Sequence, residues 1–289
     1  MLGPIVVSGL VTGGIYSLLA VGFALIFSVA RIVNMGHTGF YMLAAFLVFI
    51  GTKVFHLSIL LSAICAVAVS TLVAVGYFKG TIERVKQHEL AVLLITIAFA
   101  ILLQEIFSAL FSARFQAIDP FLLGYMELAG VRVAYQYIFA LGTSFLVLGA
   151  LLSLLRSKIG VAIRAVAQDP EIANAMGIND RQICLVVMGI SAALAALAAI
   201  LIAPIVMVHP YMWTPPLVVV LAAVVLGGLG SITGSIVGAF ILGFVEVLVV
   251  NLVPEGTFLR GVASLSAMII VLVVRPEGLF GIVFEEERL

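Results

Sequence analysis

Long, uninterrupted apolar runs constrain the fold of this chain more than any other feature. Residues 3–30, 57–78 and 133–155 contain no charged side chain, and residues 90–111 contain one. Each run reaches or exceeds the roughly 20 residues that a helix needs to cross a bilayer core at about 1.5 Å per residue. The sequence therefore predicts several membrane-spanning helices.

Composition supports the same fold class. Of the 289 residues, 64% are hydrophobic and 10% are charged, whereas soluble domains carry about 25% charged residues. Runs such as 91–103 and 218–226 do not alternate apolar and polar residues, as the strands of a membrane barrel would. We expect an all-α polytopic membrane protein, a single domain over residues 1–289 with about eight to ten membrane segments, some of them broken or short.

Charge distribution predicts the orientation. Two loops, at residues 79–86 and 156–181, hold half of the 14 lysines and arginines, and two expected spans separate them. Basic loops lie on the cytoplasmic side, so the N-terminus is expected outside and the C-terminus inside, with the tail 285–288 in solvent. The net charge of zero gives no support for a nucleic acid partner.

No catalytic or metal-binding constellation is present. The four histidines, His37, His56, His88 and His209, are far apart, and Cys65 and Cys184 lie singly in apolar runs, as packing residues do. The glycine-rich stretch 227–235 lacks the Lys-Ser or Lys-Thr of a phosphate-binding loop. We predict no catalytic residue, no metal site, no cofactor and no ATP hydrolysis by this chain.

The longest polar interruption, residues 164–180, predicts a short capped helix. Asp169 is suited to the N-cap, Pro170 to the first helical position and Glu171 to the first turn, where the helix dipole favours negative charge. Gly177 is a natural left-handed stop. The predicted helix has about two turns.

The same helix carries a small apolar stripe. Ile172, Ala175 and Met176 share one side at i, i+3, i+4 spacing. A short helix of this kind between two spans is suited to docking into another protein. The alternative is an ordinary amphipathic surface helix.

Two glycine-interrupted segments, 34–39 and 227–235, lie in opposite halves of the chain. Discontinuous segments at corresponding places indicate a substrate path near the membrane midplane. For His37 the alternative is a membrane-edge histidine that bonds nearby carbonyls. The candidate pathway residues are Asn34, His37, Tyr41, Gln104, Glu105, Ser231, Thr233 and Ser235.

Glycines in the second segment allow another interpretation. Gly230, Gly234 and Gly238 recur every four residues, and small residues at that spacing let membrane helices approach closely. The segment is thus either a packing surface or a break that faces a cavity.

Two carboxylates, Glu105 and Glu246, fall within apolar spans. A charge at the bilayer centre costs about 2.5 kcal/mol or more, so each needs a partner or water. They serve either packing, with Gln104 adjacent to Glu105, or gating and coupling.

An ordered set of short motifs resembles the permease subunits of branched-chain amino acid ABC importers. The motifs run from the first span to the C-terminus, and each is modest alone. They are the stretches 9–16, 32–37, 164–169, 176–179, 227–234 and 275–281.

The resemblance implies partners and a role for the polar interruption. The partners are a second permease subunit (a paralogue or a second copy), two cytoplasmic ATPase subunits and an extracytoplasmic substrate-binding protein, at a bacterial or archaeal inner membrane. By the same resemblance, residues 156–181 are expected to be the loop that couples to the ATPase. Its expected contact residues are Arg164, Asp169, Glu171, Ile172, Ala173, Ala175, Met176 and Gly177.

The sequence departs from the family pattern at two places. Asn174 stands where the coupling-loop pattern has its second alanine, and residues 34–37 read Asn-Met-Gly-His where many relatives have Asn-Phe-Ala-His. The expected function is half of the pathway of an ATP-driven importer for branched-chain or other small neutral amino acids. The alternatives are a permease for urea or short amides, a self-sufficient secondary transporter or channel, and a membrane scaffold.

Overall fold

Helices make up most of the part of the chain that the computed structural model describes, residues 2–112, 114–128 and 131–280. The predicted solvated tail at 285–288 lies outside this part, as does Gly281 of the last motif. In chain order the helices are α1 (Leu2–Ala30), α2 (His37–Phe49), α3 (Ile59–Tyr77), α4 (Glu83–Val85), α5 (Glu89–Phe111), α6 (Tyr135–Arg156), α7 (Lys158–Gln168), α8 (Pro170–Ala175), α9 (Asp180–Ile202), α10 (Thr214–Gly227), α11 (Ile232–Leu252) and α12 (Arg260–Val274).

Eight described helical segments are long and apolar enough to cross a membrane. Two of them gain length from π-helical turns, Ile50–Val54 after α2 and Phe78–Ile82 after α3, and the last includes the 3₁₀ turn Gly256–Leu259 before α12. Helix α10 is apolar but shorter. The all-α polytopic fold is confirmed.

One small antiparallel sheet interrupts the helical pattern. Strands β1 (Tyr125–Leu128) and β2 (Val131–Ala134) pair between α5 and α6, with Met126 opposite Val133. The sequence predicted an all-α chain and therefore no strand there. Four-residue strands are too short to show a periodic pattern.

The core of the bundle forms around α1, α2 and α9, whose side chains are mostly buried. Glycines set the close approach of α1 to α11. An added Cβ at Gly9 or Gly13 would lie 2.5 Å from the ring of Phe244 or Phe240, and one at Gly243 would meet the backbone of Gly13. In lipid, such small-residue contacts take over much of the role that apolar burial has in water.

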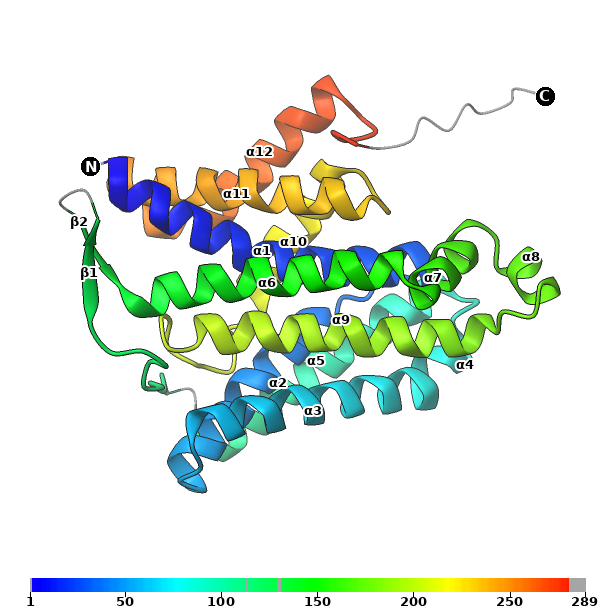
Figure 1. Ribbon diagram of the computed structural model, residues 1–289, viewed down its shortest axis with the longest axis horizontal. Coiled ribbons are helices and arrows are strands. Elements are labelled where there is room, and N and C mark those ends of the chain that lie inside the picture. Colours follow the sequence, from blue (N-terminus) through cyan, green and yellow to red (C-terminus); the bar gives the residue numbers. More distant parts are fainter. Residues whose placement is uncertain (1, 113, 129–130, 281–289) are drawn as a thin grey trace.

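The bundle has two distinct ends (Figure 1). At one end, Lys86 lies 3.7 Å from Asp180 and Arg181 pairs with Glu83, so the two basic loops lie side by side. At the other end, beside the β1–β2 hairpin, Lys53 pairs with Asp119 at 2.6 Å, and Gln116 and Val208 form a backbone bridge. The predicted placement of both basic loops on one side is confirmed.

Candidate functional site

The polar interruption between α6 and α9 folds into two helices at the end of the bundle that holds the basic loops. Helix α7 returns along the bundle end and buries Gly160, Ile163 and Val166. Helix α8 follows after one residue and lies at the outer margin of the molecule (Figure 1).

Helix α8 is capped as its sequence predicts. The Asp169 carboxylate accepts the backbone N–H groups of Glu171 at 2.8 Å and Ile172 at 3.0 Å. Pro170 occupies the first helical position, and Gly177 adopts a positive φ of 86° after the helix ends. These contacts satisfy donors that a free helix end would leave unpaired.

The tip of this segment presents apolar side chains to its surroundings. Ile172 is 61% exposed and Met176 is 79% exposed, and Ala175 is also exposed. Ala173 is instead 2% exposed, since it faces the rest of the segment. Ala173 therefore offers no side-chain surface for a partner, which corrects its place in the predicted contact set.

Hydrogen bonds tie the segment to the spans. Arg31, which follows α1, donates to the Gln168 carbonyl at 3.2 Å, and Arg164 donates to the Leu155 carbonyl at the end of α6. Asn174 accepts the backbone N–H of Asp180 at 3.1 Å. These hydrogen bonds join α7 to α1 and α6, and α8 to α9.

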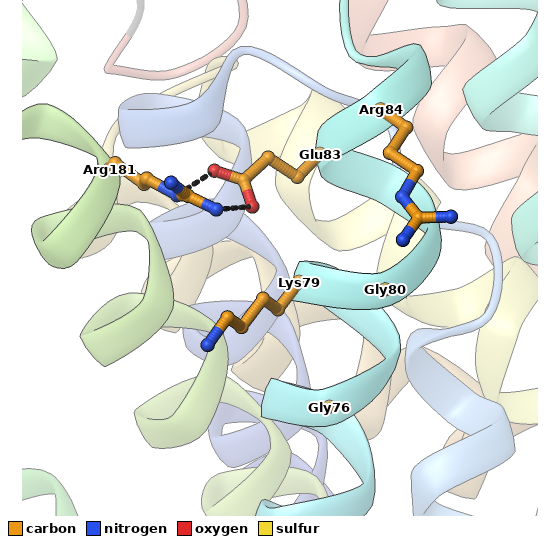
Figure 2. Close-up of a pocket in the computed structure, with 6 residues that line it drawn as sticks. All are labelled: Gly76, Lys79, Gly80, Glu83, Arg84 and Arg181. Carbon is orange, nitrogen blue, oxygen red and sulfur yellow. Dashed lines mark hydrogen bonds and ion pairs between the residues drawn. The ribbon is translucent and has the colours of Figure 1, made fainter.

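A bidentate ion pair braces the start of α9. Arg181 donates to both carboxylate oxygens of Glu83, one of them at 2.8 Å. Figure 2 shows this pair bridging α9 and the loop end of α3, with Lys79 extended beneath it. The polar segment between α6 and α9 therefore ends at a braced position.

The first glycine-interrupted segment lies inside the bundle. Asn34 is fully buried, and its side-chain amide oxygen Oδ1 accepts the Gly36 N–H at 3.1 Å. The Met35 N–H is bound by the Thr96 hydroxyl of α5 at 3.2 Å. Non-helical backbone is tolerated at membrane depth when protein surrounds it in this way.

His37 joins three helices. The fully buried ring lies with Nε2 3.1 Å from the Leu19 carbonyl of α1 and Nδ1 3.2 Å from the Ser191 hydroxyl of α9. Tyr41, one turn further along α2, is 4% exposed. His37 therefore bonds a nearby carbonyl, as its alternative interpretation expected, and neither side chain reaches the subunit surface.

The second glycine-interrupted segment also satisfies its own polar groups. Ser231 caps α11 by accepting the Gly234 N–H at 3.0 Å, and Ser235 donates to the Ser231 carbonyl at 2.8 Å. Thr233 is exposed. The segment joins the far end of α1, where Ser28 donates to the Gly230 carbonyl at 3.0 Å.

Two of the three spaced glycines form a packing surface. An added Cβ at Gly234 would collide with the Gly227 carbonyl, and one at Gly238 with the Ala223 carbonyl, so α10 and α11 touch backbone to backbone. Gly230 lies before α11 with a φ of 87°, in a turn rather than on that helix face. The expected three-glycine face therefore contains two.

Gln104 and Glu105 lie on α5 in different surroundings. Gln104 accepts the indole N–H of Trp213 at 2.8 Å and donates to Glu105 at 3.0 Å. Glu105 is exposed on the outer face of α5, between the exposed Leu102 and Ile106. Trp213, which opens α10, is a partner that sequence spacing alone did not predict.

Glu246 is 3% exposed and fully engaged. Its two oxygens accept hydrogen bonds from the hydroxyls of Tyr16 at 2.8 Å and Ser264 at 2.9 Å, which joins α11 to α1 and α12. Glu246 and Arg260 both line a cavity of about 200 Å³. Sequence spacing did not predict these partners, although Tyr16 is the last residue of the motif 9–16.

The family model and the curated relatives both point to one protein family. The family model described as "Branched-chain amino acid transport system / permease component" matches residues 5–274. The chain is 31% identical to the high-affinity branched-chain amino acid transport system permease protein BraD of Pseudomonas aeruginosa, over 95% of this chain and 94% of that protein. It is 27% identical to the permease protein LivH of Escherichia coli, over the same shares.

A solved structure shares the fold. PsaBC from Streptococcus pneumoniae in complex with Fab matches with a TM-score of 0.54 and 14% identity, over 93% of this chain and 91% of that chain. This likeness concerns the fold alone, whereas the family match covers most of the chain. The chain belongs to the family of permease components of branched-chain amino acid transport systems.

Proposed function

We propose that this chain is the permease subunit of an ATP-driven importer and forms half of its path for branched-chain or other small neutral amino acids. The named relatives are branched-chain amino acid permeases, and they match almost the whole chain. The proposed substrate is inferred from this similarity to branched-chain amino acid permeases.

The observation that carries this proposal is the exposed, capped helix α8. Its apolar side chains Ile172 and Met176 are not covered by any other part of the chain that the structure describes, yet the helix is held at both ends by contacts to the spans. A partner with an apolar groove would cover both side chains and gain roughly 1.5–3 kcal/mol for each one that becomes fully buried. A soluble ATPase that closes on ATP supplies such a partner.

The assembly that follows has four kinds of component. A second permease, two ATPase subunits at the α8 end and a substrate-binding protein at the hairpin end accompany this chain. With the basic loops inside, the N-terminus lies outside and residues 156–181 form the cytoplasmic coupling loop.

We place the substrate path along the exposed face of α5. Glu105 on that face has no described basic partner, and exposure of its charge to hydrocarbon would cost about 2.5 kcal/mol or more at the bilayer centre. A water-filled path or the second permease removes that cost. Asn34, His37, Tyr41 and Ser235 are excluded from this path, because each is buried.

Cross-linking tests the docking of α8. In a variant whose two native cysteines are replaced by alanine, a cysteine at Ile172 or Met176 is expected to form a disulfide with a cysteine in the ATPase groove. A cysteine at the buried Ala173 is the matched control and is expected to give little cross-link. Equal trapping at all three positions, or none at any, contradicts the proposal.

A further inference from the structure

An open depression of about 590 Å³ lies at the loop end of α3, beside the brace between Glu83 and Arg181. Its lining is unusually basic for so few residues, with Lys79, Arg84 and Arg181 against the single acid Glu83. Figure 2 shows Lys79 and Arg181 on one side of the α3–α4 segment, whereas Arg84 extends to the other. The depression therefore faces its surroundings with a surplus of positive charge.

Lys79 is the available cation on the side of Arg181, because Arg84, which is also unpaired among the described residues, extends to the other side (Figure 2). Arg181 is engaged by Glu83 through both carboxylate oxygens. Lys79 forms neither a hydrogen bond nor an ion pair within the described part of the chain. An anion bound in the depression would meet the Lys79 ammonium directly and the positive flank of Arg181 beside it.

Two glycines keep the floor of the depression open. An added Cβ at Gly76 or Gly80 would meet no atom within 4 Å, so neither glycine is required by packing within the subunit. Gly80 lies in the π-helical turn Phe78–Ile82, where the wider turn carries Lys79 outward. The missing side chains leave room for a group as large as a phosphate ester.

An apolar track leads along α3 to the same place. Leu61, Ile64, Ala68 and Leu72 are exposed and follow one another at three- or four-residue spacing, and Gly76 continues the series to Lys79 and Gly80. From Ala68 to Lys79 the helix rises about 16 Å at 1.5 Å per residue. That length matches one leaflet, about half of the roughly 30 Å hydrocarbon core.

We propose that this depression binds the phosphate of an anionic phospholipid of the cytoplasmic leaflet, with an acyl chain lying on the Ala68–Leu72 face of α3. The lipid is favoured over a protein partner because the cation, the open floor and the apolar track lie on one helix face. The cation and the open floor would meet the headgroup, and the apolar track would meet the acyl chain. Basic pockets between helices on the cytoplasmic side recognise such headgroups. The bound lipid sits against the brace that holds the start of α9.

Native mass spectrometry of the complex purified from membranes with phosphatidylglycerol tests this site. Lys79→Gln removes the cation, and Gly80→Leu fills the floor without a change of charge. Both variants are expected to retain about five-fold less phosphatidylglycerol than the parent protein. Lys158→Gln, which removes an exposed charge at the same end of the bundle, is the matched control and is expected to retain it.

Three outcomes overturn the proposal. Equal loss in Lys158→Gln would show that net charge alone attracts the lipid. Unchanged lipid with weaker co-purification of the ATPase would make the depression a protein contact. Displacement of the bound lipid by millimolar inorganic phosphate would show that the acyl chain contributes nothing. None of these measurements depends on transport, so a negative result leaves the proposed function intact.

Discussion

Buried polar side chains in this chain join helices to one another. His37 connects α1, α2 and α9 through Leu19 and Ser191, and Glu246 connects α11 to Tyr16 and Ser264. Interhelical hydrogen bonds in membranes contribute about 0.6 kcal/mol on average. The buried ring of His37 adds packing, because an added Cβ at Gly22 would lie 3.0 Å from it.

His37→Ala is expected to lower stability rather than selectivity. The substitution removes two hydrogen bonds and leaves a cavity, which together cost about 2–4 kcal/mol. Thermal unfolding in detergent measures the effect, with the exposed His88→Ala as control. A variant as stable as the parent but with altered substrate preference would return His37 to the substrate path.

Elements at the surface carry the features that packing does not explain. Helix α8 exposes apolar side chains at the bundle end, and α5 exposes a carboxylate along its outer face. Exposed apolar side chains are unfavourable in the water around α8, and a carboxylate is unfavourable in the hydrocarbon around α5. Both faces are therefore assigned to partners.

Asp169→Ala is expected to weaken coupling. The variant loses the two bonds that cap α8, at a cost of about 1 kcal/mol to that helix. ATP-driven uptake is expected to fall severalfold while the unfolding temperature of the whole subunit changes little. Asp169→Asn caps almost as well and is expected to retain most uptake, and equal loss in both variants would contradict a capping role.

Glu105→Gln tests the α5 path. We expect uptake to fall at least tenfold, about 1.4 kcal/mol, while assembly with the partner subunits persists, because the surface contact of the side chain is preserved. Glu89→Gln, at the other end of the same helix, serves as the control. Unchanged uptake in Glu105→Gln would remove the carboxylate from the path.

At the scale of the whole molecule, some features of the fold could be predicted from the sequence and others could not. Local features were predictable: the apolar spans, the shared side of the basic loops, and the cap and stop of α8, since each depends on neighbouring residues. Side-chain partners were not. His37 and Ser191 are separated by 154 positions and Tyr16 and Glu246 by 230, and no periodicity predicts such pairs. Consequently the partners of the buried polar residues in the glycine-interrupted segments could not be predicted from the sequence.

Uptake in proteoliposomes tests the central claim, that other subunits drive this one. Vesicles contain this chain with its permease partner, and the binding protein loaded with radiolabelled leucine is added outside. The account predicts accumulation above the external concentration only when the ATPase subunits and ATP are present inside the vesicles, on the face opposite the binding protein. Accumulation against a gradient by the permease chains alone would contradict it.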